Sequence, residues 1–208
     1  AGSIIAVCGD NNVYVDSADY ISTEQNGYTV NQIIDFEPLI TTALLNVTKG
    51  NAYNVATVTG HGEASFASNV SKYISGDNFK VSELALYNEE SVPEDTDILV
   101  INGPTEDYAT TDIDKLDKYI KAGGKVYVII NPVATYLDKL YGLLGNYGIN
   151  VVDGVIVEGD ENSYIQDTAY YILPSLESSD ITDSLMENNY QILTLRSKGL
   201  NLKQTGDY

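Results

Sequence analysis

The sequence has one cysteine, one histidine and no tryptophan among its 208 residues. A single cysteine, Cys8, cannot close a disulfide within the chain, and it cannot supply a cluster of thiolate ligands for a metal. Stability must therefore come from a packed core, and a hydrophobic content of 43% is adequate for one. We expect neither a metal ion nor a cofactor.

Basic residues are also scarce. The chain has 11 lysines and arginines against 30 aspartates and glutamates, which gives a net charge of −19. Nucleic acids and anionic membrane surfaces are negatively charged, so they repel a chain this acidic. We therefore expect no nucleic-acid partner. The charge fits a well-solvated acidic surface, and it also leaves open a basic protein partner or bound cations.

Long apolar runs are absent from the sequence, because no stretch approaches the ~18 residues typical of a membrane-spanning helix. No charged and then apolar leader precedes the first element. The 17 tyrosines, together with many Asn, Asp and Ser residues, suit an extracytoplasmic bacterial surface. We interpret the chain as a soluble fragment of a longer protein, which does not itself span a membrane.

Strand and helix patterns alternate over residues 51–157, which we take as the core domain. Apolar segments predict strands at 55–58, 79–86, 98–101 and 125–130, and two further short strands at 150–152 and 155–157. Helical spacing predicts helices over 66–76, from Thr110 or Thr111 as N-cap to 122, and over 137–147. Because βαβ crossovers place such strands side by side, we expect a three-layer α/β domain of flavodoxin-like type with a parallel sheet.

Two other segments flank this core. Residues 1–50 predict a hairpin with strands at 4–7 and 13–15, a polar loop over 17–28, and an amphipathic helix with Asp35 as its N-cap. We expect this segment to pack on the core. Residues 158–208 have weaker periodicity and predict only short elements near 164–173, 181–186 and 191–195. They extend the same domain or begin a further one.

Three loops follow the predicted central strands. The carboxyl ends of parallel strands meet at one edge of the sheet, and ligands of open α/β sheets bind along that edge. This argument locates a site without assigning an activity to it. The candidate residues for contact with a ligand or partner are Gly60, His61, Gly62, Glu63, Asn102, Gly103, Pro104 and Asn131.

His61 is the residue of this group that could act as a general base in hydrolysis or acyl transfer. Many α/β enzymes place the nucleophile in the turn after a central strand, but residues 102–104 include no serine or cysteine. Thr105 is the nearest hydroxyl and has no visible activating partner, while Cys8 belongs to the N-terminal hairpin. We therefore expect no catalytic residue. A hydrolase or amidotransferase relative that uses the His61 turn remains an alternative.

A metal site at the same turn has less support. His61 and Glu63 offer two ligands, fewer than the usual zinc set, and the Gly-His-Gly sequence is not a phosphate-binding loop. The simpler interpretation is that His61 bonds backbone groups in the turn and that a helix N-terminus favours the Glu63 carboxylate. The acidic residues at 153–161 match no EF-hand loop and predict a solvated surface.

The order of several motifs resembles the GldG-like family of auxiliary components of ABC-type transport systems, first associated with gliding motility. The most distinctive is Val58-Thr59-Gly60-His61-Gly62-Glu63, and the other matching segments are 36–48, 91–104, 116–125, 143–149 and 155–157. The resemblance covers about residues 36–160. It implies a fold related to class I glutamine amidotransferase-like domains and to an intraflagellar transport domain.

The resemblance also implies an extracytoplasmic domain, anchored to a bacterial cell membrane by helices outside this segment. Its expected partners are the permease and ATPase subunits of an ABC exporter, and transport members of the fold are not regarded as enzymes. The sequence therefore predicts a non-catalytic binding or assembly domain of an ABC transporter accessory protein. A carbohydrate- or peptide-binding module is a further alternative, because tyrosines among acidic groups suit stacking against sugars.

Overall fold

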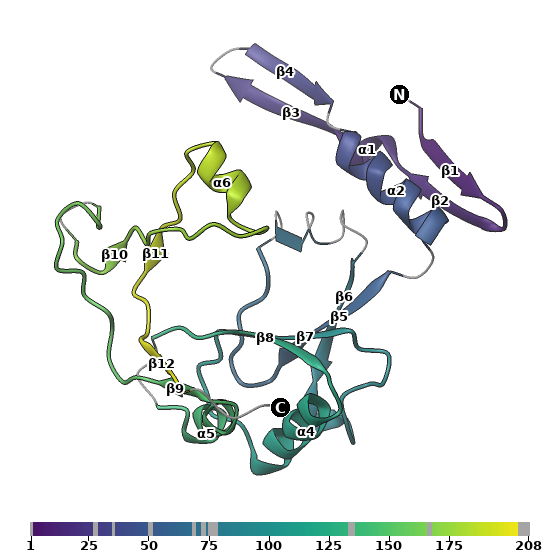
Figure 1. Ribbon diagram of the computed structural model, residues 1–208. Coiled ribbons are helices and arrows are strands. Elements are labelled where there is room, and N and C mark those ends of the chain that lie inside the picture. Colours follow the sequence, from purple (N-terminus) through teal and green to yellow (C-terminus); the bar gives the residue numbers. More distant parts are fainter. Residues whose placement is uncertain are drawn as a thin grey trace.

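The computed structural model describes residues 2–26, 29–34, 36–49, 52–67, 70–71, 74, 79–132, 136–165 and 168–203 (Figure 1). Its centre is a parallel sheet with the strand order β6-β5-β7-β8. These strands are β5 (Tyr53–Thr59), β6 (Phe79–Ala85), β7 (Ile98–Asn102) and β8 (Lys125–Ile129). All four were predicted, β6 from an alternating pattern and the other three from apolar segments, and the structure confirms them.

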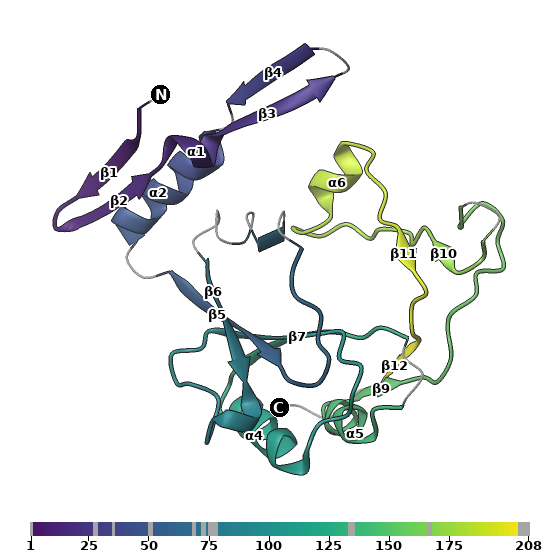
Figure 2. The same cartoon turned by 180° about the vertical axis from the view of Figure 1, so that it is seen from behind.

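Helices α4 (Thr110–Lys121) and α5 (Asp138–Asn146) lie on the same side of this sheet (Figures 1 and 2). Alternate strand residues point toward these helices and form the main core with them. Its members include Ala56, Val58, Leu99, Ile101, Leu116, Leu140 and Leu144. The other strand residues point to the opposite face, where Phe66, Val70 and Ile74 also lie. The predicted three-layer α/β class is confirmed.

The start of α4 differs from its prediction, and the helix expected over 66–76 is described only in part. The residue before α4 is Ala109, whose backbone is extended, and Thr110 is the first helical residue. The prediction of Thr110 or Thr111 as a side-chain cap is therefore wrong, since no side chain caps this end. The helix expected over 66–76 lies largely outside the described residues, although residues 70, 71 and 74 have helical backbone.

The N-terminal segment contains the predicted hairpin of β1 (Ile4–Cys8) and β2 (Asn11–Val15). Helix α2 (Glu37–Lys49) packs on this hairpin, and its expected cap, Asp35, lies outside the described residues. The loop predicted over 17–28 is wrong. That stretch begins with α1 (Ser17–Tyr20) and continues as β3 (Ile21–Asn26), which pairs with β4 (Thr29–Ile34). A two-stranded ribbon has no core-facing side, so polar residues such as those of β3 form it without the usual apolar alternation.

The C-terminal segment returns to the core through β12 (Leu200–Leu202), which pairs antiparallel with β9 (Ile149–Val151). The strand predicted at 155–157 is wrong. The regular ladder ends at Val151, the chain turns at Gly154, whose φ is +98°, and the Ile156 N–H then donates to the Ser197 carbonyl over 2.9 Å outside any regular strand. Short elements occur near the other predicted positions, as β10 (Tyr171–Ile172), β11 (Thr194–Leu195) and α6 (Asp183–Glu187). The domain boundaries at 50 and 157 stay predictions.

Among the described residues, no helix combines the length and the apolar character needed to cross a bilayer.

Candidate functional site

The three predicted loops meet at the carboxyl edge of the sheet. The Ala64 N–H donates to the Asn102 carbonyl over 2.8 Å, and the Asn102 side-chain amide donates back to the Ala64 carbonyl over 2.6 Å. The Gly103 N–H donates to the Ile129 carbonyl at the end of β8 over 2.9 Å. Backbone hydrogen bonds thus hold the ends of β5, β7 and β8 in one assembly.

Two glycines allow these loops to approach so closely. Gly62 has a φ of +73°, and a Cβ there would overlap the Thr105 hydroxyl. Gly103 has a φ of +59°, and a Cβ there would overlap the side-chain amide of Asn131. Both positions therefore need glycine, because a side chain would strain the backbone and also collide with the neighbouring loop.

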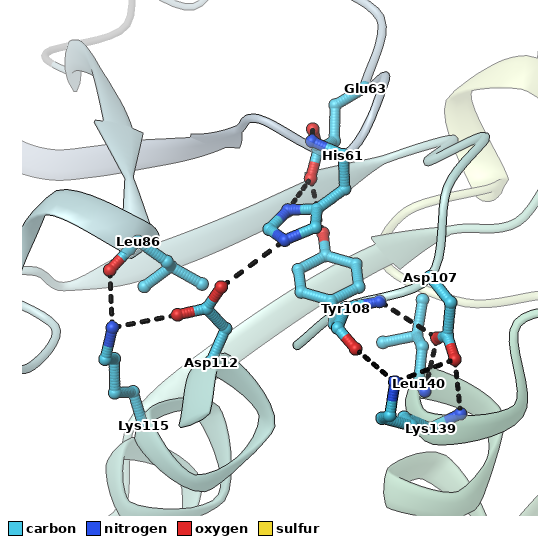
Figure 3. A network of polar contacts seen from close by, with 9 residues as sticks. All are labelled: His61, Glu63, Leu86, Asp107, Tyr108, Asp112, Lys115, Lys139 and Leu140. Atoms are coloured by element: carbon cyan, nitrogen blue, oxygen red, sulfur yellow. Dashed lines mark hydrogen bonds and ion pairs between the residues drawn. The ribbon is translucent and has the colours of Figure 1, made fainter. Parts of the chain in front are cut away.

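His61 lies inside this assembly, with 7% of its surface exposed. Its Nδ1 is 3.3 Å from Glu63 Oε1, and its Nε2 is 3.4 Å from Asp112 Oδ2 (Figure 3). The Tyr108 ring stacks on the imidazole with a centroid distance of 3.9 Å and an interplanar angle of 18°. Each ring nitrogen therefore faces a carboxylate, and the tyrosine covers a face of the ring.

Glu63 is held by two hydrogen bonds. Its Oε2 accepts the His61 backbone N–H over 2.7 Å, and its Oε1 accepts the Tyr108 hydroxyl over 2.5 Å. Burial raises the pKa of Tyr108 well above its usual range, and the hydrogen bond to the Glu63 carboxylate raises it further. Tyr108 therefore remains a donor. A helix N-terminus is not needed to explain Glu63, because its carboxylate is an acceptor within this cluster.

Asp112 and Lys115 connect the cluster to helix α4 and to the short 3-10 helix η1 (Leu86–Asn88). The Lys115 ammonium is 2.8 Å from Asp112 Oδ1, and it donates to the Leu86 carbonyl over 2.6 Å. The Asp112 side chain is 3% exposed and the Lys115 side chain 16%. Because unpaired buried charges are costly, the Lys115 ammonium offsets part of the cost of burying the Asp112 side chain.

Asp107 fixes the loop that carries Tyr108. Its carboxylate accepts the N–H groups of Lys139 over 3.0 Å and Leu140 over 3.2 Å, which are free at the start of α5 (Figure 3). The Lys139 ammonium donates to the Tyr108 carbonyl over 3.1 Å. The loop is thus bonded to α5 on one side and to the His61 turn on the other.

The predicted candidate residues divide into two groups. His61, Gly103 and Pro104 are buried, and Glu63 and Asn102 are partly buried. Gly60, Gly62 and Asn131 are exposed at the sheet edge. Sequence reasoning missed Tyr108, Asp112 and Lys115. The available signal was weak: an acidic residue in the first turn of a helix, followed by a lysine three positions later, is common on solvated helices.

In the described part of the chain, His61 has no neighbouring nucleophile for which it could act as a general base. No hydroxyl or thiol there is hydrogen-bonded to the imidazole, and the Thr105 hydroxyl points to the Gly62 carbonyl at 3.4 Å. Cys8 is exposed on the N-terminal hairpin. The interpretation of His61 as a turn residue holds for its carbonyl, which accepts the N–H groups of Thr105 and Glu106. Its ring contacts side chains instead.

A family model described as an ABC-type uncharacterized transport system, ABC_transp_aux, matches residues 52–169. The chain belongs to this family. The match extends over β5 to β9, the loops of the sheet edge and the His61 cluster. It confirms the transport part of the predicted resemblance, and the chain is an auxiliary component of an ABC-type transport system.

The fold recurs in a solved structure, the mmIFT52 N-terminal domain. The two are similar with a TM-score of 0.53 and 16% sequence identity, over 72% of this chain and 73% of that chain. At this identity the similarity shows the fold alone. None of the curated proteins compared with this chain matches it.

Replacing Lys115 by methionine tests the charge balance of the cluster. Lys115→Met leaves the buried Asp112 carboxylate without its cation, and we expect the free energy of unfolding to fall by about 3–5 kcal/mol in urea titrations. Lys121→Met is the matched control, because Lys121 pairs with Asp117 on the exposed side of the same helix. Lys121→Met should leave the urea concentration at the midpoint of unfolding nearly unchanged. Equal effects of the two substitutions would contradict this account.

Tyr108→Phe tests the hydrogen bond to Glu63. Loss of this donor should lower the free energy of unfolding by about 1–3 kcal/mol, whereas Tyr190→Phe, at a tyrosine that is 65% exposed, should have little effect.

The same variant should change the response to alkaline pH. Folded Tyr108 keeps its proton, but the unfolded chain releases it above the ordinary pKa of 10.0. Wild-type stability should therefore fall as the pH rises past that value, and Tyr108→Phe should show a smaller fall between about pH 9 and about pH 11. Parallel declines in the two proteins would overturn this assignment.

Proposed function

We propose that this chain is a non-catalytic, extracytoplasmic binding or assembly domain of an ABC transporter accessory protein. Membership of the ABC transport family supports the accessory role. The observation that carries the non-catalytic part is the environment of His61, which is buried between Glu63 and Asp112 and stacked on Tyr108.

The geometry of a catalytic triad differs from this arrangement in one decisive respect. In a triad, one imidazole nitrogen bonds a carboxylate and the other faces the nucleophile whose proton it removes. In this chain, both nitrogens lie within 3.4 Å of carboxylate oxygens. Both nitrogens thus face carboxylates of the same chain, and neither faces a hydroxyl or thiol of the described residues, although Nδ1 makes no hydrogen bond there.

The finer parts of the proposal rest on the resemblance and on composition. The Val58–Glu63 motif and the order of the other matching segments support a GldG-like protein of the gliding-motility-associated group. The same resemblance supports a permease and an ATPase as partners, and a membrane anchor in the full-length protein. The chain has 30 acidic and 11 basic residues. This acidic excess suits a domain that is exposed outside the cytoplasm, and it suits recognition of a basic protein surface.

The candidate contact residues keep distinct roles in this proposal. The buried members, such as His61 and Pro104, set the shape of the sheet edge. The exposed Gly60, Gly62 and Asn131 present that edge to a partner.

Purification of the full-length protein from the membranes of its own cells tests the transport assignment. We expect the permease and the ATPase of one ABC system to copurify with it in fixed stoichiometry. Recovery of the protein without any ABC subunit, under mild detergent conditions that keep other transporters intact, would contradict the assignment. A screen against ester and amide substrates provides the second arm. An activity that His61→Ala abolishes while the fold persists would establish the hydrolase alternative instead.

A further inference from the structure

Among the described residues, the buried cluster around His61 holds two carboxylates and one ammonium. The Glu63 and Asp112 side chains are 2% and 3% exposed, and Lys115 supplies the ammonium, 2.8 Å from Asp112 (Figure 3). Tyr108 keeps its proton, so it adds no charge. With a neutral imidazole, the cluster would carry one negative charge without a counter-ion, and such a charge is costly in a core.

The charged groups just outside this cluster do not supply the second cation. Asp107 lies beyond Tyr108, and the Lys139 ammonium is 3.9 Å from its carboxylate, so these two charges offset each other. Glu106 has an exposed side chain, and the contact of the cluster with η1 is a backbone carbonyl. Among the described residues, the imidazole is therefore the group beside both carboxylates that can become a cation.

The positions of the two ring nitrogens lead to the same conclusion. A neutral imidazole carries one proton, so its other nitrogen is an acceptor with a partial negative charge. Nδ1 is 3.3 Å from Glu63 and Nε2 is 3.4 Å from Asp112, so in either tautomer this nitrogen lies beside a carboxylate oxygen. Two buried acceptors this close repel each other, and a proton on each nitrogen replaces the repulsion by two ion pairs.

The bonds of the carboxylates place the added proton on the imidazole. Glu63 accepts the His61 backbone N–H and the Tyr108 hydroxyl, and Asp112 accepts the Lys115 ammonium. Such donors favour the ionised form of a carboxyl group. The stacked Tyr108 ring favours a charged imidazole as well, because the face of an aromatic ring attracts a cation.

We propose that His61 is an imidazolium in the folded protein at neutral pH, and that its second proton is a pH-sensitive tie between the turn after β5 and helix α4. While the proton is bound, both carboxylates attract the ring. When rising pH removes it, one carboxylate faces an unprotonated nitrogen, and the attraction between turn and helix weakens. Gly60 and Gly62 belong to this turn, so the exposed sheet edge responds to pH. This inference goes beyond the proposed function and does not depend on the transport assignment.

Nitrogen NMR of the untagged chain, labelled with ¹⁵N in histidine, tests the charge state. His61 is the only histidine, so every ring-nitrogen signal belongs to it. At about pH 7.5 an ordinary imidazole, with a pKa of about 6.5, is mostly neutral. We expect two signals of the imidazolium type from the folded protein, and the signals of a mostly neutral ring from the chain unfolded in urea. One protonated and one unprotonated nitrogen in the folded protein would overturn the proposal.

Glu63→Gln tests the role of charge balance, because it removes one negative charge at nearly constant volume. We expect the imidazole of this variant to be mostly neutral at the same pH. Asp114→Asn is the matched control, since Asp114 is exposed on α4, and it should keep both imidazolium signals. An imidazolium that persists in folded Glu63→Gln would contradict the charge-balance argument. The spectrum of the wild-type protein decides the charge state even if Glu63→Gln does not fold.

A pH titration of the uniformly labelled protein tests the tie. The backbone N–H of His61 bonds to Glu63, and those of Thr105 and Glu106 bond to the His61 carbonyl. We expect the signals of these three amides to shift in the same step as the ring nitrogens when the pH rises. The amides within α2, which packs on the N-terminal hairpin, should not follow that step. A ring that loses its proton while the three amides stay unchanged would refute the tie.

Discussion

The burial of one imidazole between two carboxylates is the interaction on which the rest of the sheet edge depends. His61 joins the turn after β5 to Asp112 of α4, and Tyr108 connects the same turn to the loop before α4. Asp107 continues the connection to α5, and Lys115 continues it to η1. Because charged and polar groups in a core are costly unless each has its partner, the loss of one member weakens several loops at once.

This constraint also explains how an α/β fold that resembles enzyme folds can serve as a scaffold. The edge where such folds bind substrates is present, and backbone hydrogen bonds hold its three loops together. Both imidazole nitrogens of His61, however, lie within 3.4 Å of carboxylate oxygens of the same chain. In the proposed function, recognition falls to the exposed loop residues at this edge, Gly60, Gly62 and Asn131. Family membership supports an accessory role in ABC-type transport.

The spacing of apolar residues in the sequence predicted those strands and helices that bury one face against the core. The apolar runs of β7 and β8 and the stripe of α4 each reflect burial against the same layer, so their positions followed from periodicity. The candidate edge also followed, because βαβ topology brings the ends of parallel strands together. The contacts of His61 did not follow. Asp112 and Tyr108 are distant in sequence, and their types suit a solvated helix or a core equally well. The β3–β4 ribbon was missed because its pairing has no buried face to impose an apolar alternation.

The central claim is that His61 is enclosed in a structural cluster, and the chain offers a direct test because this is its only histidine. Diethylpyrocarbonate modifies accessible imidazoles, and the absorbance band of the N-carbethoxyimidazole product, measured apart from the tyrosine band, reports on His61 alone in the untagged protein. The account predicts almost no modification of the native protein and complete modification in concentrated urea. Modification of the native protein at the rate of a free imidazole would show that His61 is open to solvent and to substrates, and it would contradict the account.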